Sequence, residues 1–140
     1  MDTKGRVALP PDFRKALVGP QGERLLLTKF RARDRHSVDA WPEPTFHEFE
    51  AQVLQKSQGN PKMGKIRDVY LGAATCEVDG QGRILIPQPL RDFARLEKDV
   101  VFVGRGNMFR IWRQDVWEQV EREALEIFDD EATMNELGLT

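Results

Sequence analysis

Short apolar runs, bounded by glycine, proline and aspartate, alternate along this chain with segments whose apolar residues recur at helical spacing. The runs predict strands at residues 7–9, 25–27, 38–41, 73–78, 84–86, 100–103 and 108–112. The helical spacing predicts helices that begin near Pro11, Pro42, Pro61, Pro89 and Asp115. Because short strands and helices succeed one another throughout, the pattern predicts an α+β fold that is rich in β-structure.

Each predicted helix has one apolar face. The faces comprise Phe13, Ala16 and Leu17; Phe46, Phe49, Val53 and Leu54; Met63, Ile66 and Tyr70; Leu90, Phe93 and Ala94; and Val116, Trp117, Val120, Ala124 and Ile127. A turn at 19–22 is expected to end the first helix. Asn60 is expected to cap the third, and Asp115 with Glu118 resembles a capping box. The tail beyond Asp129 is expected to be frayed.

Residues 2–14 and 79–91 are two versions of one motif, 77 residues apart. Each version has an aspartate that can bond backbone N–H groups ahead of it, then a glycine free to take a positive φ, then an arginine at the edge of the turn. The aligned residues are Asp2 and Asp79, Gly5 and Gly82, and Arg6 and Arg83. Trp41 and Trp112 close the two copies at an offset of 71. The repeat indicates a duplicated β-rich domain and not a solenoid.

The repeat divides the chain into four segments. Residues 1–47 form the first unit, 48–72 a helical connector, 73–116 the second unit, and 117–140 a C-terminal helix with an acidic tail. The second unit begins with a predicted strand at 73–78. Nothing before Asp2 corresponds to it, so the first unit is expected to lack its first strand.

Charge is distributed unevenly along the sequence. The whole chain has a net charge of −2, but residues 1–35 carry nine Lys/Arg against four Asp/Glu, and 114–140 carry one against nine. Such segregation can leave a cationic face on an acidic protein, where the local field matters more than the total. The alternative is an acidic solvated tail beside an unremarkable basic segment. Within that segment, the basic loop at 29–36 is a candidate clamp on a nucleic-acid backbone.

Several classes of chemistry find no support in the sequence. One cysteine, Cys76, and two histidines, His36 and His47, make neither a disulfide framework nor a convincing zinc site, and a single cysteine fits a reducing cytosol. There is no apolar run of the roughly 20 residues that span a membrane. No Ser/His/Asp set or phosphate-cradling loop is found. We therefore expect no catalytic residues, metal, cofactor, small-molecule substrate or membrane partner.

The two turn arginines have two readings from the residues alone. Arg6 and Arg83 could contact DNA phosphates or guanine edges, since arginine presents a bidentate donor fork. They could instead pair with Asp2 and Asp79 and stiffen the turns. Lys4 is favoured as a phosphate contact. Arg14 and Arg91 follow the predicted helix faces by one position and are expected to be exposed.

The motifs Asp2-x-Lys4-Gly5-Arg6 and Asp79-x-x-Gly82-Arg83, each followed by an apolar strand and Pro-x-x-Leu/Phe-Arg, resemble the MraZ family, whose halves are similar to AbrB DNA-binding domains. The resemblance implies two tandem swapped-hairpin or double-psi-like AbrB-type units that form a β-barrel core with peripheral helices. It also implies a ring-like homo-oligomer, octameric or larger, that acts as a repressor. This oligomer would bind repeated promoter boxes upstream of the division and cell-wall gene cluster.

The resemblance also implies where DNA is bound. The expected DNA-binding residues are Lys4, Arg6, Arg14, Gln81, Arg83 and Arg91, and the expected turn scaffold is Asp2, Gly5, Asp79 and Gly82. The partners would be double-stranded promoter DNA and further copies of the chain, in the cytoplasm and associated with the nucleoid. Gln81 stands where the first turn has Lys4, so the two units need not contribute equally.

Two other functions stay open at this point. A protein-interaction or scaffold module without DNA binding is compatible with the missing first strand and the acidic tail. An AbrB-like antitoxin would have a single such unit and a toxin-binding tail, and the duplication argues against it.

Overall fold

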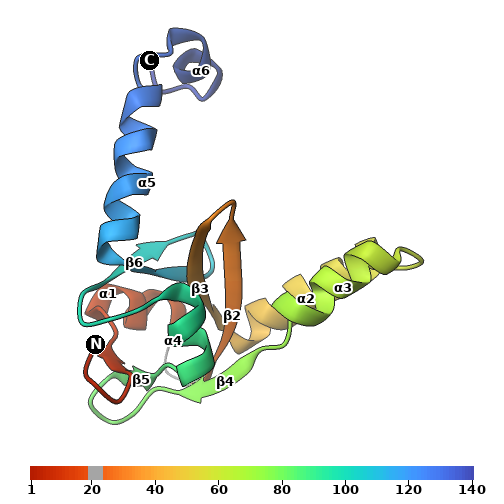
Figure 1. The fold of residues 1–140 in the computed structure, drawn as a ribbon, viewed down its shortest axis with the longest axis vertical. Helices are drawn as coiled ribbons and strands as arrows, with labels where there is room; N and C mark the ends of the chain where they lie inside the picture. Colours follow the sequence, from red (N-terminus) through yellow and green to blue (C-terminus); the bar gives the residue numbers. More distant parts are fainter. Residues whose placement is uncertain (19–23) are drawn as a thin grey trace.

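The computed structural model describes residues 1–18 and 24–140, and it has two antiparallel sheets (Figure 1). The smaller sheet pairs β1 (Arg6–Ala8) with β5 (Arg83–Leu85). The larger has the order β4 (Ala74–Glu77), β2 (Arg24–Ala32), β3 (Arg35–Pro42), β7 (Phe109–Arg113), β6 (Val100–Gly104). The prediction of an α+β fold is confirmed. The expected β-barrel is wrong: the described residues form two open sheets and no closed barrel.

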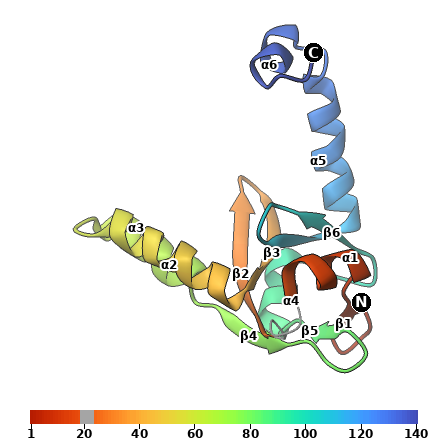
Figure 2. The same ribbon diagram turned by 180° about the vertical axis from the view of Figure 1, so that it is seen from behind.

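The helices fall into two groups by position. Close to the sheets lie α1 (Pro11–Phe13), which continues as a turn of π-helix, η1 (Arg14–Val18), and α4 (Gln88–Ala94). Two projections leave the sheets: a hairpin of α2 (Glu43–Ser57) and α3 (Pro61–Tyr70), and the helix α5 (Gln114–Ile127) with α6 (Glu131–Glu136) at its tip. Figures 1 and 2 show the two projections pointing in different directions.

Both sheets combine strands of the two sequence units. In the small sheet Val7 lies opposite Ile84, its own counterpart at the offset of 77. In the large sheet Asp39 lies opposite Arg110, its counterpart at the offset of 71. In an antiparallel pair, a residue can lie opposite its own counterpart only where a twofold axis between the two copies passes through that pair. The two units are therefore related by an approximate twofold axis that passes through both strand pairs.

The main hydrophobic core lies where strands of both sheets and α4 meet. Its fully buried side chains include Leu25, Leu27, Val38, Ile84, Ile86, Phe109 and Ile111. Leu25 and Leu27 alternate with Leu26 and Thr28, which face the other side of the sheet, as the alternation of side chains along a strand requires. Phe13 closes one side by packing against Phe109 with ring centroids 5.6 Å apart. Burial of this apolar surface is the main force that holds the two units together.

A second, smaller cluster fixes the base of α2. Trp41, Phe46 and Met108 are buried together, and the Trp41 ring stacks on Phe49 with centroids 4.4 Å apart. The Trp41 Nε1–H donates to Thr28 Oγ1 at 3.0 Å, which satisfies the polar end of a buried indole. Trp41 is thus a packing residue at the end of β3.

Several element boundaries differ from the expected ones. The basic segment 29–36 is not a loop, because β2 and β3 continue through it to a turn where Arg33 takes φ 59. Ala16, which was placed on the predicted apolar face, is exposed and lies in the π-helical turn η1. The predicted turn at 19–22 lies outside the described residues. Residues beyond Asp129 form α6, with Met134 buried, and are not frayed there.

The helix caps were predicted with mixed success. Asn60 Oδ1 accepts a hydrogen bond from the Met63 amide at 3.0 Å, so the predicted N-cap is confirmed. The predicted capping box at Asp115 is wrong. Helix α5 begins one residue earlier, with Arg113 at the N-cap position and no side-chain cap.

Candidate nucleic-acid interface

The first turn is organised by the Asp2 carboxylate. Its Oδ1 accepts hydrogen bonds from the amides of Lys4 and Arg6, both at 2.9 Å. The Gly5 amide closes the turn by donating to the Asp2 carbonyl at 3.2 Å. These bonds to the ionised carboxylate, led by that from the Arg6 amide, hold the pKa of Asp2 below its ordinary value. The Asp2 carboxylate therefore organises the turn through bonds to backbone amides.

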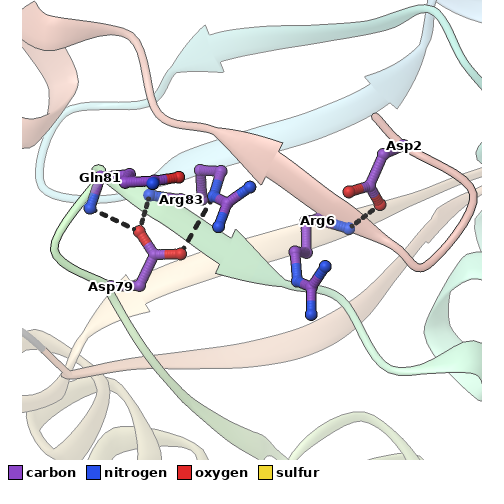
Figure 3. A network of polar contacts seen from close by, with 5 residues as sticks. All are labelled: Asp2, Arg6, Asp79, Gln81 and Arg83. Atoms are coloured by element: carbon purple, nitrogen blue, oxygen red, sulfur yellow. Dashed lines mark hydrogen bonds and ion pairs between the residues drawn. The ribbon is translucent and has the colours of Figure 1, made fainter.

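The second turn repeats this arrangement and adds one bond. Asp79 Oδ1 accepts from the Gln81 amide at 2.8 Å and the Arg83 amide at 2.9 Å. Its Oδ2 also accepts from the Arg83 Nε at 3.0 Å (Figure 3). The pKa of Asp79 is lowered, first by the Arg83 amide and then by its other donors. The second turn is thus tied more firmly than the first.

Each turn glycine is covered by an arginine of the other unit. Gly5 has φ 89 and Gly82 has φ 76, a region that suits glycine. A Cβ on Gly5 would lie 2.6 Å from Arg91 Nε, and one on Gly82 would lie 2.8 Å from Arg14 Nη1. Arg14 is exposed but Arg91 is half-buried, which differs from the expected exposure of both. These contacts repeat the approximate twofold symmetry of the fold.

The strands that follow the turns form one short two-stranded ribbon. Arg6 lies opposite Leu85, and Ala8 lies opposite Arg83. The register continues at both ends, because the Leu9 amide donates to the Gly82 carbonyl and the Ile86 amide to the Gly5 carbonyl, both at 2.9 Å. The structure thus brings the two predicted arginines, one from each copy of the motif, onto neighbouring strands.

The ribbon has one buried and one outer face. Side chains alternate along a strand, and Val7 and Ile84 are buried. The outer face therefore carries Arg6 and Arg83 on a diagonal, with Ala8 and Leu85 at the other corners. Leu85 is 51% exposed, an apolar surface residue beside two cations. Its position facing Arg6 comes from strand register, which the motif alone does not specify.

The two outer arginines differ in how firmly they are held. The Arg83 guanidinium pairs with Asp79, so at this turn the predicted ion pair exists. Within residues 1–18 and 24–140 the Arg6 side chain makes no ion pair, and Figure 3 shows it extending away from the Asp2 carboxylate. Lys4 and Gln81 are exposed at the two turns. Of the two arginines, Arg83 is thus tethered to its own turn and Arg6 is the more available to a partner.

The other basic residues considered from the sequence lie elsewhere. Arg35 forms an ion pair with Glu123 of α5 and so anchors that helix to β3. The Arg31 Nε donates to the Arg33 carbonyl across the β2–β3 turn. These contacts have structural roles: one holds α5 against β3, and the other stabilises the β2–β3 turn. The 29–36 segment projects from the sheet as a hairpin and is not part of the β1–β5 ribbon (Figure 1).

Sequence reasoning did not find the buried ion pair between Asp39 and Arg110. Arg110 Nε donates to Asp39 Oδ1 at 2.6 Å, and Nη2 donates to Oδ2 at 3.2 Å. The signal was present, because the two residues are 71 positions apart, which is the offset of the repeat at Trp41 and Trp112.

Other chemistry is scarce in the described part of the chain. No group of three or more His, Cys, Asp or Glu there could hold a metal ion. Cys76 is buried, and burial raises the pKa of its thiol to about 12, so it is not a ready nucleophile. Among the helices described, none has the length and apolar character needed to cross a membrane.

Comparison with known proteins agrees with the resemblance found in the turn motifs. A family model described as "MraZ protein, putative antitoxin-like" matches residues 69–137. A "Transcriptional regulator MraZ" of Thioalkalivibrio sulfidiphilus is 40% identical over 119 residues, which is 84% of this chain and 77% of the relative. Relatives with the same name from Chromobacterium violaceum and Leuconostoc citreum are each 36% identical, covering 91% and 93% of this chain and 84% and 87% of their own. By these matches, which extend over most of its length, the chain belongs to the MraZ family.

Proposed function

We propose that this protein is a sequence-specific transcriptional regulator that binds double-stranded promoter DNA with the outer face of the β1–β5 ribbon. The observation that carries the proposal is the placement of Arg6 and Arg83 on one exposed two-stranded face. The relatives are named as transcriptional regulators. That name also confirms the prediction that the chain is not an enzyme.

The geometry of a two-stranded ribbon suits the major groove of DNA, which is wide enough to admit one. In this mode the guanidinium groups of Arg6 and Arg83 meet guanine edges or phosphates. Lys4, at the tip of the first turn, meets a phosphate, and Gln81 takes the corresponding place at the second. Arg91 packs against Gly5 and Arg14 packs against Gly82. Both arginines add positive charge close to the two turns.

One ribbon offers a small footprint, so we propose that the protein works as a ring-like homo-oligomer. A ring repeats the ribbon along one face, and effective concentration multiplies a weak single contact. Such an assembly would bind repeated promoter boxes and act as a repressor of the division and cell-wall gene cluster. The protein would then be cytoplasmic and associated with the nucleoid.

The division of the chain belongs to the same proposal. The units at 1–47 and 73–116 supply one strand of the ribbon each. The connector at 48–72 and the C-terminal segment at 117–140 supply most of the two projections, which we assign to contacts between copies.

The test is a fluorescence titration of labelled duplex DNA from upstream of the protein's own operon, at several salt concentrations. The Arg6→Ala/Arg83→Ala variant should bind at least 10-fold more weakly, since each arginine that meets a base edge is worth about 1–3 kcal/mol. The slope of log affinity against log salt should also become shallower, by about 0.9 for each phosphate that the variant no longer neutralises. Arg122→Ala on α5 is the matched control and should bind as the wild type does.

Equal binding by the ribbon variant and the wild type would refute the site. If no duplex binds even at low salt, the protein is an interaction or scaffold module and the proposed function is wrong. An AbrB-like antitoxin role would show instead as a stable complex with a co-expressed toxin.

A further inference from the structure

Among the residues that the structure describes, the outer face of the β1–β5 ribbon carries one large apolar side chain, Leu85. It shares this face with Arg6 and Arg83 (Figure 3), and Ala8 takes the remaining corner. Leu85 and Ala8 are counterparts at the offset of 77, so the two copies of the motif differ at this position. The contacts proposed above use the cationic and amide side chains and give Leu85 no part in binding.

Strand register places Leu85 directly beside Arg6. The hydrogen bonds that close the two ends of the ribbon join the residue pairs next to Arg6–Leu85 and next to Ala8–Arg83. Hydrogen-bonded and non-hydrogen-bonded pairs alternate along antiparallel strands, so Arg6–Leu85 is of the second kind, in which the side chains are closer. The Cβ atoms of such a pair lie about 4.5–5.5 Å apart. A base that meets the Arg6 guanidinium therefore has an apolar side chain next to it.

The apolar part of the face is too small and too divided for a protein partner. Leu85 and Ala8 are diagonal neighbours, about 7–8 Å apart, and the two arginines occupy the other corners. Surfaces that bind proteins have contiguous apolar patches of several hundred Å². The major groove of DNA presents a single apolar group of the matching size, the C5-methyl group of thymine, beside the hydrogen-bond acceptors of neighbouring bases.

We propose that Leu85 is a specificity-determining residue that packs against the C5-methyl group of a thymine next to the base that Arg6 contacts. This inference rests on the proposed function and names a base that the ribbon selects. Ala8, with its short side chain, does not reach the equivalent methyl group at the other end of the face. The approximately twofold ribbon thus distinguishes the two directions along the DNA, because only its second strand reads a methyl group.

The test compares two versions of one duplex for each protein. The duplex is DNA from upstream of the protein's own operon, and each of its thymines is replaced in turn by deoxyuridine, which lacks only the C5-methyl group. Fluorescence titration gives the ratio of the dissociation constants of the deoxyuridine and thymine versions. Both versions meet the same protein, so any effect of a substitution on stability or assembly cancels in this ratio.

The wild type should bind at least one deoxyuridine version about fourfold more weakly than the thymine version, the factor expected for one buried group of methyl size. Leu85→Ala should bind these two versions equally, whereas Leu85→Met, which keeps an apolar side chain, should retain the ratio. Leu139→Ala shortens an exposed leucine far from the ribbon in sequence and is the matched control; it should also retain the ratio. Circular dichroism should show the same fold in all four proteins, because both leucines are exposed.

Two results would overturn the inference and leave the proposed function in place. One is a wild type that binds every deoxyuridine version as tightly as the thymine version. The other is a ratio that Leu85→Ala does not change, even if that variant binds both versions more weakly, because the leucine would then contact the sugar and phosphate groups. The proposed function itself fails only if the wild type binds no duplex, or if the Arg6→Ala/Arg83→Ala variant binds the thymine version as the wild type does.

Discussion

Asp39 and Arg110, which are equivalent positions of the two repeats, face each other on β3 and β7 and form a buried ion pair. Their exposed fractions are 5% and 7%, and the Arg110 guanidinium lies 3.3 Å from the centre of the Phe30 ring. Counterparts that meet at a twofold axis would repel each other if both kept the same charge. Because both repeats lie in one chain, the two equivalent positions can carry different residues, and here they are the acid Asp39 and the base Arg110.

Removing one member of this pair should destabilise the protein strongly. Asp39→Ala leaves a buried guanidinium without its carboxylate and should lower the free energy of unfolding by about 3–5 kcal/mol. The double variant Asp39→Leu/Arg110→Met should recover most of this stability. Urea unfolding measures both. Arg113→Ala, which breaks exposed pairs with Glu97 and Asp115, is the control and should change stability by less than about 1 kcal/mol. Equal effects of Asp39→Ala and the control would contradict this account.

The turn glycines should tolerate alanine unequally. Gly5→Ala places a Cβ 2.8 Å from the Ile86 carbonyl oxygen as well as against Arg91, whereas Gly82→Ala meets mainly the movable end of Arg14. Both substitutions add about 1–2 kcal/mol for a left-handed backbone. Gly5→Ala should therefore be the more destabilising of the two in urea unfolding.

Gly80→Ala provides the matched control for these variants. It lies in the same second turn, has no atom within 4 Å of an added Cβ, and is not at a positive φ. It should leave the unfolding midpoint nearly unchanged. A decrease in stability at Gly80 as large as that at Gly5 would mean that the turns are sensitive to any side chain.

The turn aspartates should make stability depend on pH in the acid range. The pKa of Asp79 is lowered from its ordinary value of 3.8, chiefly by the Arg83 amide, so the folded state favours the ionised carboxylate. Its stabilisation is complete above pH 3.8 and is lost as the pH falls through the folded-state pKa. Asp79→Asn should thus be less stable than the wild type at neutral pH, and the difference should shrink on acidification. A difference that does not vary with pH would refute this.

The ion pair of Arg35 with Glu123 should control the mobility of α5 more than the stability of the whole chain. Both side chains are at the surface, and bonding to Arg35 lowers the pKa of Glu123. Glu123→Gln should speed amide hydrogen exchange in α5 and leave the urea midpoint almost unchanged. Arg122→Ala, one residue away, is the control and should not speed exchange. A large shift in the midpoint would show that α5 is part of the cooperative core.

Much of the local structure could be predicted from the sequence, because it depends on nearby residues. The Asp-to-amide bonds of both turns and the Asn60 cap follow from short-range chemistry that each motif carries. The apolar face of α4 was also predicted correctly, with Leu90 and Ala94 buried. Such features need no knowledge of the rest of the chain.

The pairing of β1 with β5 could not be predicted in the same way. A strand of three residues such as Arg6–Ala8 gives a side-chain alternation but no partner or register. The cover that Arg14 and Arg91 give to the opposite turns depends on the twofold arrangement, which only the tertiary fold creates. The length of β2 was missed because Lys29 and Arg31 are polar residues in a strand that projects into solvent.

The mixing of both units in each sheet also affects synthesis of the protein on the ribosome. When residues 1–72 have emerged, β1 has no partner, because β5 has not yet been made, and β3 lacks its neighbour β7. The nascent chain can form the β2–β3 hairpin and the α2–α3 hairpin, but neither sheet can be completed. Folding must wait for the second half of the chain, and during that interval apolar side chains such as Leu25 and Val38 lack their final packing and are open to a chaperone.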